Sequence, residues 1–135
     1  MVELLNILAR WLSFFFATGR YRLVNSESSP SFGNALIDIA SGDLEWRLVR
    51  DRSQVFLDCR PVSDNLKSHE WFSADLLIRL LSNRRVESAE LTSEMARWFE
   101  ENLSEIEKSL SGDRMVETVG QLKRLKQLRS KELFG

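Results

Sequence analysis

The sequence has little of what would assign a protein to a chemical function. Its single cysteine, Cys59, excludes an internal disulfide or a cysteine zinc site and is typical of a reducing compartment. Nineteen basic and twenty acidic side chains give a net charge of -1, which offers no general attraction to nucleic acid or to anionic membranes. The single histidine, His69, stands outside any recognisable catalytic motif. We therefore expect a protein that is not an enzyme and that carries no metal or cofactor.

The amino-terminal stretch, residues 2–16, is apolar but too interrupted by charge to be a targeting or membrane-spanning segment. Glu3 lies where a signal peptide is positive, and Arg10 breaks the apolar run. Leucine and aromatic residues recur at intervals of three and four, which predicts a helix with one apolar side. A helix on a membrane surface is the less favoured alternative, because the cationic polar side is missing. The stretch predicts a buried first helix in a cytoplasmic protein.

The clearest signal is the stretch 43–60, DLEWRLVRDRSQVFLDCR, in which apolar and polar residues alternate in two runs. This is the pattern of a half-buried antiparallel hairpin. A turn at residues 50–53 places Trp46 opposite Leu57 and all the apolar residues on one face. Residues 20–26 and 35–40 are predicted as two preceding strands, the second joined to the hairpin by a short turn that sets Ile39 opposite Leu44. The result is a four-stranded antiparallel meander.

The same register puts three carboxylates in one row on the other face of the sheet: Asp38, Glu45 and Asp58. Directly opposed like charges are destabilising, so the row needs counter-charge. Arg47 and Arg60 share this face and are the favoured source. The alternatives are basic side chains of a partner and, less favoured, a divalent metal. An enzyme that used the row would need a neighbouring pocket and at least one strongly raised carboxyl pKa.

Helical periodicity appears in three later segments, residues 73–81, 87–110 and 113–133. In the middle segment, five glutamates fall within roughly 60° of one another, away from the apolar side, at about 100° per residue: Glu87, Glu90, Glu94, Glu101 and Glu105. A solvated surface is the default interpretation. A binding surface for a basic partner is the functional one, which the bordering Trp98 favours. The basic last segment predicts an antiparallel pair with this acidic helix rather than a nucleic-acid site.

A resemblance to a known class of proteins rests on residues 21–61, which contain the pieces WRLVRDR and QVFLD, and on WFSADLL at 71–77. Over roughly residues 20–82 the chain is similar to small bacterial immunity proteins of polymorphic-toxin and contact-dependent growth inhibition systems. The resemblance implies a cytosolic protein that binds the toxin domain of a sister cell and blocks its active site or an essential surface. It assigns no individual binding residue, because such surfaces differ with each toxin.

Taken together, the sequence predicts one α+β domain over residues 1–135, in the order α-β-β-β-β-α-α-α. The expected function is non-catalytic inhibition of a cognate toxin domain, for which a nuclease is one candidate, without a nucleic-acid or membrane partner. The alternative is a structural or adaptor protein that forms a homodimer through its C-terminal helices. The expected partner-binding residues are Glu87, Glu90, Glu94, Trp98, Glu101, Glu105, Asp38, Glu45 and Asp58.

Overall fold

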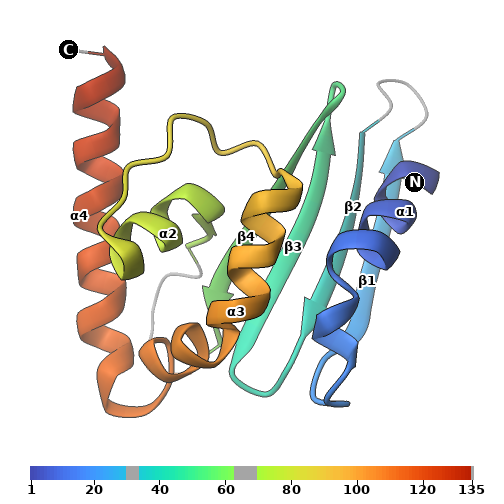
Figure 1. Ribbon diagram of the computed structural model, residues 1–135, viewed down its shortest axis with the longest axis horizontal. Coiled ribbons are helices and arrows are strands. Elements are labelled where there is room, and N and C mark those ends of the chain that lie inside the picture. Colours follow the sequence, from blue (N-terminus) through green and yellow to red (C-terminus); the bar gives the residue numbers. More distant parts are fainter. Residues whose placement is uncertain (30–33, 63–69, 135) are drawn as a thin grey trace.

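The computed structural model describes residues 1–29, 34–62 and 70–134, and it shows an antiparallel sheet with helices packed around it (Figure 1). The strands follow one another in the sheet as β1 (Arg22–Ser29), β2 (Asn34–Ala40), β3 (Leu44–Asp51), β4 (Gln54–Pro61) and β5 (Phe72–Ser73). The helices are α1 (Val2–Trp11), α2 (Ala74–Ser82), α3 (Ser93–Ser109) and α4 (Met115–Phe134), with 3₁₀ turns η1 (Ser13–Phe16) and η2 (Gly112–Arg114). The α+β class and the meander of the first four strands are confirmed.

The prediction of four strands is wrong, because a short fifth strand precedes α2. The sequence predicted a helix from residue 73 with no strand before it, but the backbone of Phe72 and Ser73 pairs with Cys59 and Asp58 of β4. Ser73 still occupies the N-cap position of α2, as its residue type predicts. The structure therefore uses this segment twice, first as an edge of the sheet and then as the start of a helix.

The core lies between one face of the sheet and helices α1 and α3, which run across that face (Figure 1). Trp46 of β3 is fully buried, with its ring centroid 5.1 Å from that of Phe15 and 5.5 Å from that of Phe99. Alternate residues of β3 and β4 face this core, as the hydrophobic pattern predicts. The side of α1 that carries Leu4 and Leu8 is buried as well. None of the described helices combines the length and the apolar character needed to cross a bilayer.

The predicted strand register is wrong by two residues in both central pairings. Trp46 lies opposite Cys59 rather than Leu57, and Ile39 lies opposite Trp46 rather than Leu44. The hairpin turn contains only Arg52 and Ser53, whose φ angles of 60° and 143° let the strands continue further than a four-residue turn allows. A shift of two residues keeps every side chain on its predicted face. The burial pattern is therefore as expected, although the partners across the strands are different.

Two predictions about the helices are also wrong. The acidic helix begins at Ser93, not at residue 87, because the preceding segment is extended and the Leu91 amide donates to the Val55 carbonyl at 2.8 Å. The Thr92 side chain caps α3 by accepting from the Met95 amide at 3.2 Å. The basic helix α4 packs mainly against α2 rather than beside α3 (Figure 1). Two of its basic residues form ion pairs near β5 and α2, Lys126 with Glu70 and Arg129 with Asp75.

Candidate functional site

A row of polar residues crosses the sheet on the face opposite Trp46. The observed register aligns one residue from each strand: Asn25, Asp38, Arg47, Asp58 and Ser73. An arginine thus stands between the two aspartates, where the sequence predicted a third carboxylate. Glu45 lies instead opposite Arg60. The predicted row of three adjacent acids is therefore wrong, because the register differs by two residues.

The chain's own arginines compensate two of the three carboxylates. Arg47 donates to both oxygens of Asp38, at 2.7 Å and 3.0 Å, and Asn25 donates to the same carboxylate at 3.3 Å. Arg60 pairs with Glu45 at 3.0 Å. Charge-assisted bidentate pairs of this kind are among the strongest hydrogen bonds in proteins. The favoured expectation, that Arg47 and Arg60 supply the counter-charge, is thus confirmed for Asp38 and Glu45, and these two candidate partner-binding residues are neutralised within the sheet.

Trp71, which the sequence did not single out, lies over these arginines. The guanidinium carbons of Arg47 and Arg60 lie 4.6 Å and 4.3 Å from the centroid of its ring. Cation–π contacts at this distance stabilise the segment that leads into β5. The sequence could not predict this contact, because Trp71 is far along the chain from the hairpin that carries the two arginines.

Asp58 differs from the other two carboxylates. Its side chain makes no hydrogen bond or ion pair with any described residue, although Arg47 lies opposite it, because Arg47 is committed to Asp38. Burial raises the pKa of Asp58, against the opposing charge of Arg47, and the nearby charge of Asp75 raises it further. The carboxylate lies at the surface of an open groove.

We call this depression the sheet groove, and it has a volume of about 1020 Å³. It is bounded by β3 and β4, by the start of α2, by residues 85–89 and by the C-terminal part of α4. Its lining residues are Val49, Asp51, Phe56, Asp58, Ser73, Asp75, Arg79, Arg85, Val86, Glu87, Ala89, Arg129, Ser130, Leu133 and Phe134. Asp58 and Glu87, predicted as parts of two separate acidic features, therefore line the same groove.

The arginines of the sheet groove are held by acids of the chain itself. Arg129 donates to both oxygens of Asp75, at 3.1 Å and 3.0 Å, and to Ser73 at 2.7 Å. Arg79 and Arg85 both pair with Glu132, at 2.7 Å and 3.0 Å. These contacts tie α4 to α2 and to the segment after it. The arginines that line the groove are therefore already in ion pairs within the chain.

An enzyme built on the predicted acidic row is not what the structure assembles. A groove and a raised carboxyl pKa are present at Asp58, but the neighbours of Asp58 in the row are Arg47 and Ser73, and the predicted neighbour Glu45 is not among them. In residues 1–29, 34–62 and 70–134, no three or more His, Cys, Asp or Glu side chains are arranged to hold a metal ion. His69 lies outside the described residues.

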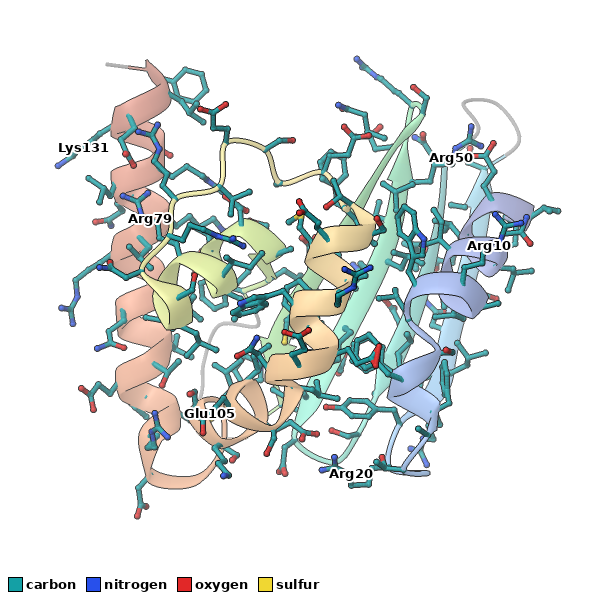
Figure 2. All side chains as sticks on the ribbon, viewed as in Figure 1. Arg10, Arg20, Arg50, Arg79, Glu105 and Lys131 are labelled. Atoms are coloured by element: carbon teal, nitrogen blue, oxygen red, sulfur yellow. The ribbon has the colours of Figure 1, made fainter. Side chains whose placement is uncertain are left out.

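The second candidate surface is the acidic face of α3, which consists of Glu94, Glu101 and Glu105. All three are exposed, and they extend along roughly 16 Å of helix at 1.5 Å per residue. Glu94 and Glu101 pair with no other described residue, and Glu105 has only Lys108, at 4.0 Å. Figure 2 labels Glu105 toward the C-terminal end of the helix.

The remaining residues of the predicted stripe lie elsewhere. Glu87 is in the sheet groove, and Glu90 forms a backbone bridge with Phe56 before the helix begins. Trp98 is half-buried beside the acidic face, with its ring edge-on to Phe99 at 5.2 Å. The acidic face thus keeps three of the five predicted glutamates, since only these lie on regular helix.

Another acid of α3 has a structural role. Glu107 accepts from the Tyr21 hydroxyl at 2.7 Å and pairs with Arg20 at 3.1 Å. Burial raises the pKa of Tyr21, and the Glu107 carboxylate raises it further. This contact ties α3 to the residues before β1, so Glu107 does not contribute free charge to the acidic face.

The structure thus has two surfaces with available carboxylates, the acidic face of α3 and the sheet groove, and both contain carboxylates that form no ion pair with a described residue. Comparison of the chain with models of protein families, with curated proteins and with solved structures finds no match in any of the three.

Proposed function

We propose that the protein is an immunity protein that binds a cognate bacterial toxin domain and blocks it without catalysis. The observation that carries the proposal is the acidic face of α3, where Glu94 and Glu101 have no ion-pair partner among the described residues. A basic surface on the toxin, such as the substrate groove of a nuclease, would supply the counter-charge. The resemblance of residues 20–82 to immunity proteins supports the same class.

The packing of α3 suits it to present these charges. Met95, Phe99 and Ile106 on its other side are at most 6% exposed and fix the helix to the core. A carboxylate on a fixed helix needs little ordering when a partner binds, so less of the interaction energy is lost. Complementary charge also accelerates association, which suits an inhibitor that must intercept an incoming toxin.

The proposal is tested by co-expression with candidate toxin domains taken from the reading frames beside the gene. The wild-type chain should restore growth and co-purify with one of these domains. The double variant Glu94→Lys/Glu101→Lys should protect poorly, whereas Asp113→Lys/Glu117→Lys should protect fully. The control makes the same change of charge at exposed residues near the start of α4. A wild-type chain that neither binds the toxin domain nor restores growth would refute the proposal.

Self-association through α4 is the second candidate, and exposed apolar residues favour it. Val116, Leu128, Leu133 and Phe134 are 65%, 43%, 61% and 88% exposed. At about 100° per residue Val116 and Phe134 fall on one side of the helix, whereas Leu128 and Leu133 lie roughly 120° and 100° away from it in opposite directions, so the four do not form one continuous seam. Sedimentation equilibrium tests this candidate directly. A molecular mass that rises with concentration would support it, and a monomer at every concentration would reject it.

A further inference from the structure

We infer that the sheet groove receives an arginine side chain of the bound protein partner, with the guanidinium hydrogen-bonded to Asp58 and stacked on Phe56, and with the stem against Val49. The inference rests on the proposed function, because it assumes that the ligand is a protein. It adds a second contact, away from the acidic face of α3. It also names the chemistry of the group that is recognised.

The first step is the state of Asp58. Its neighbours in the polar row are both committed elsewhere: Arg47 to Asp38 with two hydrogen bonds, and Ser73 to Asp75 and Arg129. A half-buried carboxylate without a partner is costly, and a charged donor entering the groove would remove that cost. Burial raises the pKa of Asp58, and the charges of Arg47, Lys126 and Arg129 offset that rise only in part.

The second step is the charge of the groove as a whole. Its three arginines are paired with Asp75 and Glu132. Asp51, Asp58 and Glu87 line the same groove, and their side chains form no ion pair or hydrogen bond with a described residue. The surplus is therefore negative, and it favours a cation over an anion. A phosphate or carboxylate ligand would have to displace Glu132 or Asp75 before it reached the arginines.

The third step is the apolar surface beside Asp58. Phe56 lies two residues from Asp58 on β4, on the same face of the sheet, and Val49 lies directly opposite Phe56 on β3. Both are half-buried and line the groove, as does Val86. A planar guanidinium can stack on an aromatic ring while it donates two parallel hydrogen bonds to a carboxylate. An ammonium cannot do both, so the arrangement favours arginine over lysine.

The fourth step is size. A volume of about 1020 Å³ is ample for one arginine side chain together with part of the segment that carries it, since compact ligand sites have volumes of about 300–1,000 Å³. The groove is open rather than enclosed, so a side chain can enter from a partner's surface without any movement of α4. This geometry favours a side chain of a protein over an enclosed small metabolite.

The test is a titration of the full chain, followed by NMR, with the blocked amino acid N-acetyl-arginine methylamide. Its neutral isostere, N-acetyl-citrulline methylamide, and the lysine equivalent serve as comparisons. The arginine probe should shift the signals of Val49, Phe56, Asp58 and Val86. Asp58→Asn, which keeps the shape of the side chain, should weaken binding about tenfold, the effect of one charged hydrogen-bonded pair. Glu94→Gln, the matched loss of one charge on α3, should leave binding unchanged.

Three outcomes would overturn the inference. If the citrulline probe shifts the groove signals as strongly as the arginine probe does, charge is not what the groove recognises. If Asp58→Asn binds the arginine probe as tightly as wild type does, Asp58 is not the binding site. An equal response to the lysine probe would reject arginine as the preferred group. Because the probe needs no toxin, these results are separate from growth protection, which alone tests the proposed function.

Discussion

Arg47 on β3 lies directly opposite Asp38 on β2 and donates to both oxygens of its carboxylate, at 2.7 Å and 3.0 Å. Asp38 is only 5% exposed, and its hydrogen bond to Arg47, together with its charge, raises the pKa of Arg47 in turn. This pair closes the polar row toward β1 and leaves Asp58 without an arginine of its own. Because Arg47 is bound to Asp38, the Asp38 carboxylate stabilises the sheet, whereas the Asp58 carboxylate stays available to a ligand.

Removing Arg47 should therefore destabilise the fold strongly. Arg47→Met leaves the buried Asp38 carboxylate with Asn25 as its one hydrogen-bond donor among the described residues, and we expect a loss of about 3 kcal/mol in the free energy of unfolding. Urea denaturation measures it. The double variant Asp38→Asn/Arg47→Met should recover part of the loss, and Arg97→Met, at an exposed position on α3, should stay within about 0.5 kcal/mol of wild type. Equal stabilities of Arg47→Met and wild type would contradict this account.

Glycine at position 53 should stabilise the hairpin. Ser53 has a φ of 143°, a conformation that costs a residue with a Cβ of the order of 1 kcal/mol. Ser53→Gly removes that cost, and we expect an unfolding free energy higher by up to about 1 kcal/mol, partly offset by chain entropy. Ser53→Ala removes the same hydroxyl but keeps the Cβ, so it should give no gain. A gain with alanine as large as with glycine would assign the effect to the hydroxyl.

The stability of Asp58→Asn should depend on pH in a defined direction. Because burial raises the pKa of Asp58 in the folded state, the folded protein binds this proton more readily than the unfolded chain. Asp58 therefore destabilises the fold above its folded-state pKa, and the cost disappears as the pH falls below the ordinary value of 3.8. Thermal melts should show Asp58→Asn more stable than wild type at neutral pH and equal to it in acid. A difference that does not change with pH would contradict the assignment.

The acidic face of α3 should control how fast the toxin domain binds. Glu94→Lys/Glu101→Lys should lower the association rate constant about tenfold or more at low salt, and the rate should lose its dependence on salt. Stopped-flow mixing at several salt concentrations measures both. Asp113→Lys/Glu117→Lys, with the same change in net charge, should associate nearly as fast as wild type. Identical kinetics for the two double variants would show that net charge, not this surface, steers binding.

The docking of α4 should depend on Arg129. Asp75 is 6% exposed, and Arg129 on α4 neutralises it with two contacts of 3.0 Å and 3.1 Å. Arg129→Met should therefore cost about 3 kcal/mol and speed amide hydrogen exchange in the C-terminal half of α4. Lys123→Met, at an exposed position on the same helix, should change neither. Unchanged exchange in Arg129→Met would show that apolar packing on α2 suffices.

Hydrophobic alternation predicted the burial of the central hairpin correctly, because side-chain direction depends only on whether a position is odd or even. It could not predict the strand partners, which depend on the turn. Two-residue turns are usually marked by glycine or asparagine, and Arg52-Ser53 carries neither. The start of α3 was missed for a tertiary reason, since Leu91 is drawn into pairing with Val55. Thr92, a good N-cap residue, was the local signal that could have corrected it.

The sheet groove was beyond reach of the sequence. Asp58, Glu87 and Arg129 come from three parts of the chain, and only the packing of α4 on α2 brings them together. The acidic face of α3 was predicted in part because its residues are neighbours on one helix. Periodicity therefore located the surface made by one element, while the groove needed the tertiary structure.

The expected and observed strand registers differ by two residues, and such a shift leaves Trp46 on the same, buried face of the sheet. Hydrophobic burial alone is therefore compatible with either register. In one of them Asp38, Glu45 and Asp58 would lie opposite one another, and in the other Arg47 stands between Asp38 and Asp58 while Glu45 lies opposite Arg60. Cross-strand charge pairs on the outer face of the sheet thus select the strand register, because both registers bury the same apolar side chains.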